Sequence, residues 1–221
     1  GMAIPIMILG ESGSGKSASL RNVDPSTAIL VQPISKPLPF RGAWPKWDRA
    51  TKTGSVVSSD NFDVICKVIH SAAAVGKKMV IIDDFQYVMA NEFMRRCNEK
   101  SFDKFTDIGN HAWQIINSAQ AAAGDVRVYF LSHVENDSSG RSKVKTIGRM
   151  LDEKITLEGM FTIVLGAHVM DGRHVFTTKN SGMDTVKAPM GMFETAEIDN
   201  DLAMVDAAIC DYYEINNKET N

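Results

Sequence analysis

The chain has 221 residues, of which 44% are hydrophobic and 23% are charged, and its formal net charge at pH 7 is −3. This length and apolar content suffice for one α/β domain and are short for two. The slightly acidic balance excludes a uniformly basic nucleic-acid-binding protein, so any contact with DNA would be restricted to local basic segments.

Cysteine usage and apolar run lengths indicate the compartment. The three cysteines are odd in number and far apart, which argues against a disulfide framework or a structural zinc site and favours a reducing cytoplasm. No apolar run reaches the roughly 20 residues of a membrane span, and no signal-peptide pattern opens the chain, so we expect no membrane association. We interpret Gly1 as a cloning remnant and residues 216–221 as a flexible tail.

The first third of the chain begins with an apolar run over residues 3–9, which predicts a buried strand that ends at Gly10. After a glycine-rich turn we expect a helix over 16–21 and a second buried strand over 28–31. The stretch from there to Ser59 is rich in proline, glycine, tryptophan and basic residues, which is typical of a loop region.

The middle of the chain predicts alternating helices and strands. Asp60 is expected to cap a helix that continues to Val75 and ends at Gly76, because its apolar residues fall on one helical face. The expected order after it is a strand over 79–82, helices over 86–97 and 103–123, and a strand over 126–131 that is followed by a polar loop.

The last third predicts a hairpin and a helix. Residues 161–167 and 174–178 flank Asp171 and Gly172, a pair that favours a tight turn, and a final helix is expected over 201–213. The whole pattern predicts an α/β fold in one domain over residues 1–221. It would be a mostly parallel sheet with helices on both faces and an antiparallel hairpin at one edge.

One glycine-rich stretch matches the pattern G-x-x-x-x-G-K-[ST] in full and lies between a predicted strand and a predicted helix. Its residues are Gly10, Glu11, Ser12, Gly13, Ser14, Gly15, Lys16 and Ser17. The glycines allow backbone N–H groups to converge on phosphate oxygens, and the following helix would direct its N-terminus at the same anion. Lys16 would hold the β- and γ-phosphates of ATP, and the Ser17 hydroxyl would ligate Mg²⁺. The alternative is an ordinary turn that contains a lysine.

Two adjacent carboxylates, Asp83 and Asp84, follow the apolar run over 79–82. A nucleotide site of this kind needs a carboxylate at the end of a buried strand to hold the water shell of Mg²⁺, and we assign that role to Asp83. The metal and Lys16 would then keep a half-buried carboxylate ionised. Asp84 is either a general base that polarises an attacking water or the N-cap of the next helix. Gln86 could orient water or simply occupy the first helical turn, and we favour the second alternative.

The strand over 126–131 ends in Ser132 and His133. A polar residue at this position, on the strand after the one that carries the metal-shell carboxylate, commonly senses the γ-phosphate in the additional-strand class of P-loop ATPases. We therefore predict His133 as a sensor, ahead of Ser132. A hydrogen-bonded structural histidine is the alternative, although ligands of α/β sheets bind at this edge.

Together the loop over 10–17, the segment 82–86 (IDDFQ), the segment 129–133 (YFLSH) and the segment 185–193 (TVKAPMGMF) resemble the RecA-like ATPase core over residues 3–213. More narrowly, the chain resembles small phage-encoded ATP-binding proteins of that class, some of which accompany single-strand annealing and recombination. The resemblance implies an Mg²⁺-dependent ATPase that acts on phage DNA in the cytoplasm of a bacterial host.

The resemblance also raises the question of the catalytic base and of a partner cation. RecA-like recombinases usually take a glutamate from a strand end before the metal-shell strand, but residues 31–59 contain no acidic residue except Asp48. Asp84 is therefore the expected base, or hydrolysis is slow. The resemblance implies a homo-oligomer in which a neighbouring subunit inserts a cation at the γ-phosphate. The candidates are Lys179, Lys187 and Arg149.

Two basic segments are candidates for contact with single-stranded DNA, since cations follow a phosphate backbone and aromatic rings stack on unpaired bases. The first carries Phe40, Trp44 and Trp47 among the cations Lys36, Arg41, Lys46, Arg49 and Lys52. The second, after the predicted sensor, carries Arg141, Lys143, Lys145 and Arg149. The alternatives are aromatic rings that cover the sheet edge and a solvated basic loop.

Two other functions remain open. A P-loop kinase for a small molecule would need paired lid arginines, for which Arg141 and Arg149 are a weak match. A nucleotide-gated assembly module would bind ATP and hardly hydrolyse it. A GTPase is disfavoured, because residues 178–181 (TKNS) reverse the order of an N-K-x-D base-reading motif.

Overall fold

The computed structural model describes residues 1–146 and 156–215. Its sheet has the order β3-β2-β4-β5-β1-β7-β8-β9, with β6 paired to β5 outside that path. The strands are β1 (Ile4–Gly10), β2 (Ala28–Gln32), β3 (Val56–Ser58), β4 (Met79–Ile82), β5 (Arg127–Asn136), β6 (Ser142–Val144), β7 (Ile163–Met170), β8 (Arg173–Thr177) and β9 (Glu197–Asp199). The α-helices are α1 (Phe62–Ser71), α2 (Gln86–Arg95), α3 (Asp103–Ala121) and α5 (Leu202–Tyr212). Short 3₁₀ helices are η1 (Ser17–Asn22), η2 (Pro25–Thr27), η3 (Ala73–Val75) and η4 (Leu157–Met160).

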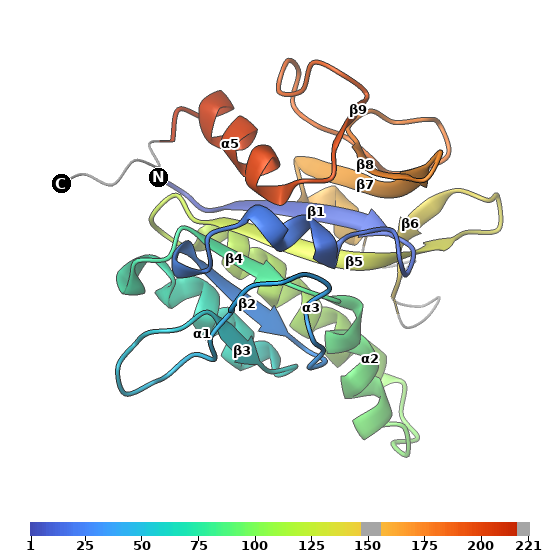
Figure 1. Ribbon diagram of the computed structural model, residues 1–221. Coiled ribbons are helices and arrows are strands. Elements are labelled where there is room, and N and C mark those ends of the chain that lie inside the picture. The colour runs from blue at the N-terminus through green and yellow to red at the C-terminus, as the bar shows by residue number, and fades with distance from the viewer. Residues whose placement is uncertain (147–155, 216–221) are drawn as a thin grey trace.

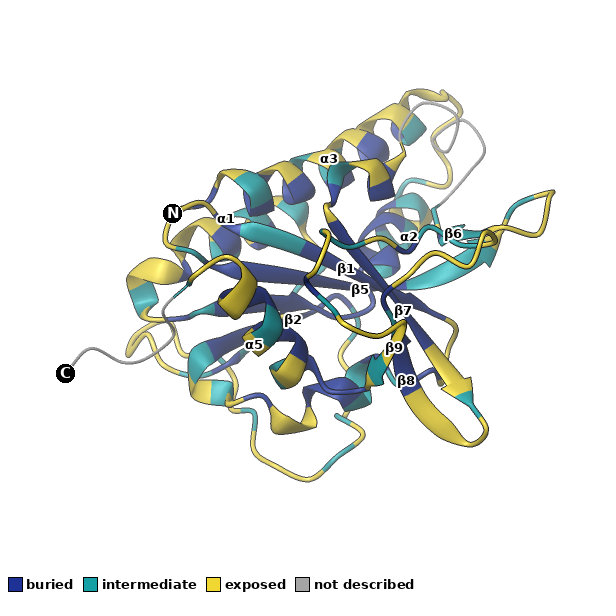
Figure 2. Ribbon diagram, turned by 90° about the horizontal axis from the view of Figure 1, so that it is seen from above, coloured by how far each residue is buried: buried dark blue, intermediate teal, exposed yellow. Residues whose placement is uncertain are grey.

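The sheet is covered on both faces, as predicted (Figure 1). The helices α1, α2 and α3 pack on one face, and η1 and α5 pack on the other. Figure 2 shows the central strands buried between these layers, whereas the tip of the β7–β8 hairpin is exposed. Strands buried on both faces need apolar side chains in both directions, which explains the continuous apolar runs of β1, β2 and β4.

The parallel part of the sheet brings the ends of four strands together. β1 lies between β5 and β7 and is parallel to both, and β4 lies between β5 and β2 and is parallel to both. In the β1–β5 register Gly10 is opposite His133, and in the β2–β4 register Val31 is opposite Ile82. The residues that follow these positions therefore meet at one edge of the sheet.

The predicted edge hairpin is present and is antiparallel. β7 and β8 are joined by a turn at Asp171 and Gly172, which have φ angles of 51° and 77°. Positive φ at both central residues is the turn that matches the twist of a hairpin, so the Asp-Gly pair was a correct signal. β9, which the sequence analysis did not predict, adds a further antiparallel strand beside β8.

Three local predictions need correction. The helix expected over 16–21 is a 3₁₀ helix of six residues, so it supplies little aligned dipole at its N-terminus. Asn61, not Asp60, caps α1, and its side chain accepts hydrogen bonds from the N–H groups of Asp63 and Val64. The strand expected to end at residue 131 continues to Asn136 and pairs with β6, where a polar loop was predicted.

A buried charge cluster ties the last helix to the sheet. Arg127 on β5 makes two hydrogen bonds of 2.8 Å to the carboxylate of Asp206 on α5. The Tyr129 hydroxyl donates to the same carboxylate at 2.7 Å. All three side chains are buried, so each charge and each polar atom depends on the others for compensation.

Among the described residues, no helix combines the length and the apolar character that crossing a bilayer requires.

Candidate functional site

The loop over residues 10–17 leaves the end of β1 and curls into a concave cradle. Gly15 has a φ of 97°, and a Cβ there would approach the side chains of His174 and Asn200 to 2.8 Å. A Cβ on Gly10 would collide with the Ser14 hydroxyl and lie 2.8 Å from the Ala167 carbonyl oxygen. Both glycines are therefore required by close approach of the surrounding chain, and the loop is compact because they lack side chains.

Lys16 fills the cradle. Its ammonium donates hydrogen bonds to the carbonyl oxygens of Gly10 at 2.7 Å and Glu11 at 2.9 Å, and it lies 3.4 Å from the Ser14 hydroxyl. Burial lowers the pKa of Lys16 from 10.5 to about 8, although the carboxylates of Asp84 and Asp83 oppose this shift. The ammonium of Lys16 is thus poorly solvated in the loop. An anionic ligand in the cradle would therefore be stabilised by Lys16.

Ser17 and Asp83 meet at the floor of the site. The Ser17 hydroxyl lies 2.9 Å and 3.1 Å from the two carboxylate oxygens of Asp83, which directly follows β4. Burial, and then the charge of Asp84, raise the pKa of the Asp83 carboxyl. The Ser17 hydrogen bond and the charge of Lys36 act in the opposite direction and only partly offset this rise. A buried carboxylate in this condition is suited to a nearby divalent cation, which would favour its ionised form.

These two side chains fit the requirements of Mg²⁺. Among residues 1–146 and 156–215, no group of three or more His, Cys, Asp and Glu side chains could hold a metal by itself. Mg²⁺ does not need such a group, because it keeps several waters and takes only one or two protein oxygens when phosphate oxygens complete its shell. The hydroxyl of Ser17 and the carboxylate of Asp83 provide oxygens of that kind.

Asp84 is not a helix cap. The residue before α2 is Phe85, and no side chain caps that helix. Asp84 has a φ of 53°, in the left-handed region, and this conformation directs its carboxylate into the site. There it lies 2.5 Å from the Lys36 ammonium and 3.6 Å from Nε2 of His133. The N-cap alternative is therefore wrong.

His133 and Gln86 are coupled to each other. The Gln86 side-chain oxygen accepts hydrogen bonds from the backbone N–H of His133 at 3.0 Å and from the Ser132 hydroxyl at 3.3 Å. Gln86 lies on the first turn of α2, as predicted, and its side chain is buried against β5. Burial, and then the charge of Lys16, lower the pKa of His133, which makes its imidazole neutral at pH 7. His133 therefore faces the site as a neutral hydrogen-bonding group.

Three residues of the site were missed by sequence reasoning. Lys36, assigned there to a DNA-binding segment, lies in the cavity because it follows β2, the parallel neighbour of β4. His174 on β8 lies with Nδ1 3.1 Å from the Ser14 carbonyl oxygen, and Asn200 donates to the Gly15 carbonyl oxygen at 3.0 Å. A carbonyl oxygen only accepts, so Nδ1 of His174 carries a proton. No local signal marks these positions, because sheet pairing and the return of the chain bring them to the loop.

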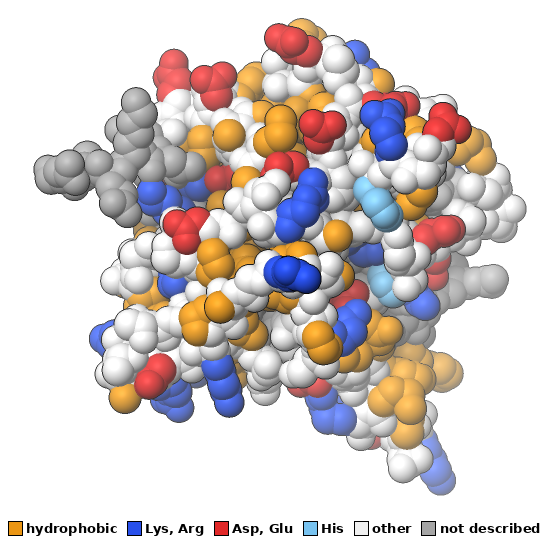
Figure 3. Space-filling view, in the orientation of Figure 1, with side chains coloured by type: hydrophobic (Ala, Val, Ile, Leu, Met, Phe, Trp, Pro, Cys, Tyr) orange, Lys and Arg blue, Asp and Glu red, His pale blue; other side chains and the backbone are white. Residues whose placement is uncertain are grey.

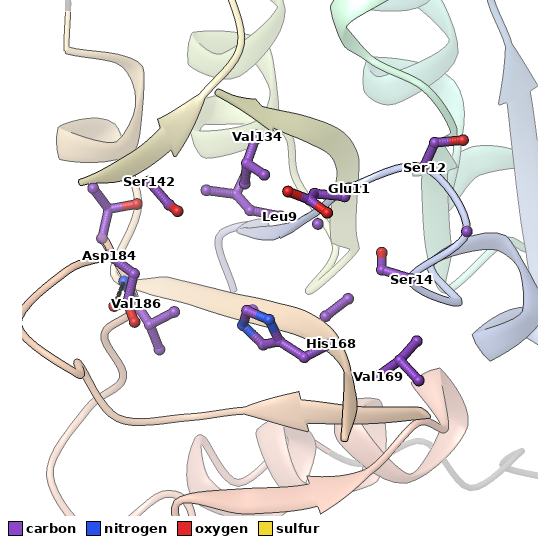
Figure 4. Close-up of a pocket in the computed structure, with 15 residues that line it drawn as sticks. Leu9, Glu11, Ser12, Ser14, Val134, Ser142, His168, Val169, Asp184 and Val186 are labelled. Atoms are coloured by element: carbon purple, nitrogen blue, oxygen red, sulfur yellow. Dashed lines mark hydrogen bonds between the residues drawn. The ribbon is translucent and has the colours of Figure 1, made fainter. Parts of the chain in front are cut away.

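The cradle opens into a cavity of about 320 Å³. Its lining includes Ser12, Lys16, Lys36, Asp83, His133 and His174. A second cavity of similar volume lies on the β7 side of the loop (Figure 4). Its described lining contains the carboxylates of Glu11 and Asp184 and the ring of His168, but no lysine or arginine. The first cavity, with two ammonium groups, is the better site for a phosphate.

The two segments predicted to bind DNA differ in how their side chains lie. Phe40, Trp44 and Trp47 are half-buried and pack against the core, so these rings cover the sheet. Arg141 and Lys143 lie on or next to the β5–β6 hairpin, whereas Arg149 lies outside the described residues. On the face shown in Figure 3, lysine and arginine side chains are scattered among other residues and do not form one continuous basic patch.

The candidates for a cation from a neighbouring subunit do not belong to the site of their own chain. Lys179 and Lys187 are exposed and absent from the lining of the cavity. The backbone of Lys187 pairs with Val164 on β7, which fixes its position at that side of the sheet. The third candidate, Arg149, lies outside the described residues.

The sequence was compared with protein-family models and with curated proteins, and neither comparison gives a match.

Proposed function

We propose that the protein binds ATP together with Mg²⁺ in the cavity at the 10–17 loop and hydrolyses the bond between the β- and γ-phosphates. One observation carries the proposal. The Ser17 hydroxyl is hydrogen-bonded to the Asp83 carboxylate, beside the buried ammonium of Lys16. Lys16 and Ser17 of the phosphate-binding motif thus lie beside Asp83, which follows a different strand. Asp83 supplies the carboxylate that an Mg²⁺–ATP site requires.

The sheet order supports a P-loop ATPase of RecA-like type. β5 lies between β1, which leads into the loop, and β4, which leads into Asp83. An inserted strand at this place agrees with the additional-strand class of P-loop ATPases, and His133 lies on that inserted strand. The short 3₁₀ helix after the loop is a departure, so the loop N–H groups and Lys16 would carry most of the phosphate binding.

The side chains have separate tasks in this proposal. Lys16 would leave the loop carbonyl oxygens and hold the β- and γ-phosphates. Ser17 and Asp83 would hold Mg²⁺, which would supply positive charge against the charge that develops on the phosphate oxygens. Asp84 would accept the proton of the attacking water, and neutral His133 would contact the γ-phosphate or that water through a hydrogen bond.

The biological setting is a proposal that rests on the resemblance to phage ATP-binding proteins. It places the ATPase in phage DNA recombination or replication, as a homo-oligomer with a cation from a neighbouring subunit. The exposed cations of the β5–β6 hairpin are the candidates for contact with single-stranded DNA. The alternatives of a small-molecule kinase and a nucleotide-gated module share the same ATP site and differ in what accepts the phosphate.

The experiment that tests the proposal is a titration of the protein with ATP and Mg²⁺, together with an assay of phosphate release. Lys16→Ala should weaken ATP binding about 10- to 150-fold, since a hydrogen bond to a charged group contributes about 1.5–3 kcal/mol. Lys100→Ala removes an exposed lysine outside the cavity and should change nothing. Failure of the unmodified protein to bind ATP at millimolar concentration would overturn the proposal.

A further inference from the structure

Lys36 is positioned by the strand that precedes it. Gln32, the last residue of β2, is buried and donates its side-chain amide to the Lys36 carbonyl oxygen at 3.0 Å. Pro33 and Pro37 flank the short segment and limit its backbone freedom. The backbone of Lys36 is therefore held at the rim of the cavity, while the side chain is 52% exposed and has room to change its rotamer.

The two lysines of the cavity differ in their partners. The Lys16 ammonium is surrounded by carbonyl oxygens of its own loop. The Lys36 ammonium instead lies 2.5 Å from the Asp84 carboxylate, whose side chain is only 6% exposed. This ion pair raises the pKa of Lys36, which keeps the side chain charged through the neutral range. Lys36 thus occupies the carboxylate that is the candidate base.

We propose that Lys36 is a ligand for the γ-phosphate from the same chain and that it moves from Asp84 to this phosphate when ATP binds. The inference rests on the proposed ATPase function and assigns a residue that controls its base. While Lys36 is paired with Asp84, its ammonium occupies a carboxylate oxygen that would otherwise face the attacking water. The transfer of Lys36 to the phosphate frees the carboxylate only when a third phosphate is present.

Hydrolysis in this proposal is a displacement at the γ-phosphorus by water. The oxygen of a water molecule forms a bond to the γ-phosphorus, and the bond from that phosphorus to the β–γ bridging oxygen breaks. The electron pair of the broken bond stays on ADP, and Asp84 takes the proton of the water. With ATP bound, Lys36 and Lys16 both face the added negative charge of the γ-phosphate. With ADP bound, there is no γ-phosphate, and Lys36 stays paired with Asp84.

Three features of the cavity favour the transfer. Lys36, Lys16, Ser17 and His133 line the same space, so a phosphate that reaches Lys16 is near Lys36. A terminal phosphate carries more negative charge than a carboxylate and offers three oxygens as acceptors. The Lys36 side chain is 52% exposed, so its ammonium can turn from Asp84 to the phosphate without repacking the core.

The test compares binding of ATP and of ADP, each with Mg²⁺ and without DNA, by calorimetry. In Lys36→Ala the affinity for ATP should fall about 10-fold or more, while the affinity for ADP stays within about 2-fold. Arg41→Ala is the matched control, because it removes an exposed cation of the same segment that does not line the cavity. It should leave both affinities unchanged. Lys16→Ala should weaken both.

The outcomes separate this inference from the proposed function. If the unmodified protein binds neither nucleotide, the ATPase proposal fails. If it binds both and Lys36→Ala keeps the same ratio of ATP to ADP affinity, only the role of Lys36 is overturned. A circular dichroism melt of Lys36→Ala shows whether the variant is folded, and Lys36→Arg, which keeps the charge, should restore at least part of the preference for ATP.

Discussion

The hydroxyl of Ser17 is hydrogen-bonded to the carboxylate of Asp83, although the two residues are 66 positions apart in the chain. They meet because β1 and β4 are parallel strands of one sheet and end at the same edge, with β5 between them. The contact joins the two halves of the proposed Mg²⁺–ATP site.

Asp83→Asn tests the metal half of the site. The amide keeps the size of the side chain and accepts the Ser17 hydrogen bond, but it removes the charge that would favour Mg²⁺. We expect Mg²⁺ to increase ATP affinity in the unmodified protein and to have about 10-fold less effect in the variant. Calorimetric titrations with Mg²⁺ and with EDTA measure this difference. An equal response to Mg²⁺ in both proteins would exclude Asp83 from the metal shell.

Asp83→Asn should also change the thermal stability of the protein without ligand. The pKa of Asp83 is raised by burial, so the folded state disfavours the ionised carboxyl at pH 7 relative to the unfolded chain. Asp83→Asn should therefore raise the melting temperature in EDTA at pH 7. A lower melting temperature would contradict the electrostatic account.

Asp84→Asn tests the base. Asn tolerates the left-handed backbone that Asp84 adopts, so we expect the variant to fold. Single-turnover hydrolysis should fall about 10²- to 10⁴-fold, the usual contribution of a general base. ATP affinity should hold or rise, because Lys36 no longer has a carboxylate partner. Hydrolysis within twofold of the unmodified rate would point to a different base.

The pH dependence of ATP binding should follow Lys16. A bound phosphate favours the protonated ammonium and raises its pKa, so binding takes up a proton wherever Lys16 is neutral in the free protein. With a pKa of about 8, affinity should be level below that value and fall by up to about 10-fold per pH unit above it. Titrations at pH 9 in buffers of different ionisation enthalpy would detect the proton. Lys16→Arg should flatten the profile.

Asp206→Ala tests the buried cluster that holds α5. The change leaves the Arg127 guanidinium without its bidentate carboxylate and the Tyr129 hydroxyl without its acceptor. Removal of one partner from a buried ion pair costs about 3–5 kcal/mol, so the free energy of unfolding should fall by that amount. Urea denaturation measures it. Asp211→Ala, on an exposed position of the same helix, should change stability by less than about 0.5 kcal/mol.

Binding of single-stranded DNA should depend on the β5–β6 hairpin more than on residues 36–52. The aromatic rings of the latter segment pack against the core and are not free to stack on bases. Fluorescence anisotropy at low salt should show weaker binding for the double variant Arg141→Ala, Lys145→Ala than for Arg49→Ala, Lys52→Ala. Equal effects would reject this order, and an absence of binding at low salt would remove DNA as a partner.

Most of the fold could be predicted from the sequence, and so could the part of the candidate site that is contiguous along the chain. Buried parallel strands and the 10–17 motif are local patterns, so β1, β4 and the loop were predicted close to their observed bounds. Lys36 could not be recognised, because its role depends on the pairing of β2 with β4, which no local pattern shows. The first-turn position of Gln86 was predicted, but the contact of its side chain with the backbone of β5 depends on sheet pairing and has no local signal.

The placement of β1 has a consequence for synthesis on the ribosome. This strand emerges before both of its neighbours, since β5 and β7 are made more than a hundred residues later, and Asn200 can contact Gly15 only after residue 200 is made. At about 5–20 residues per second, this buried apolar strand stays unpaired for roughly 6–25 s before β5 emerges. The nascent chain should thus be a chaperone client, and a ribosome stalled before residue 127 should display a cradle that cannot yet bind nucleotide.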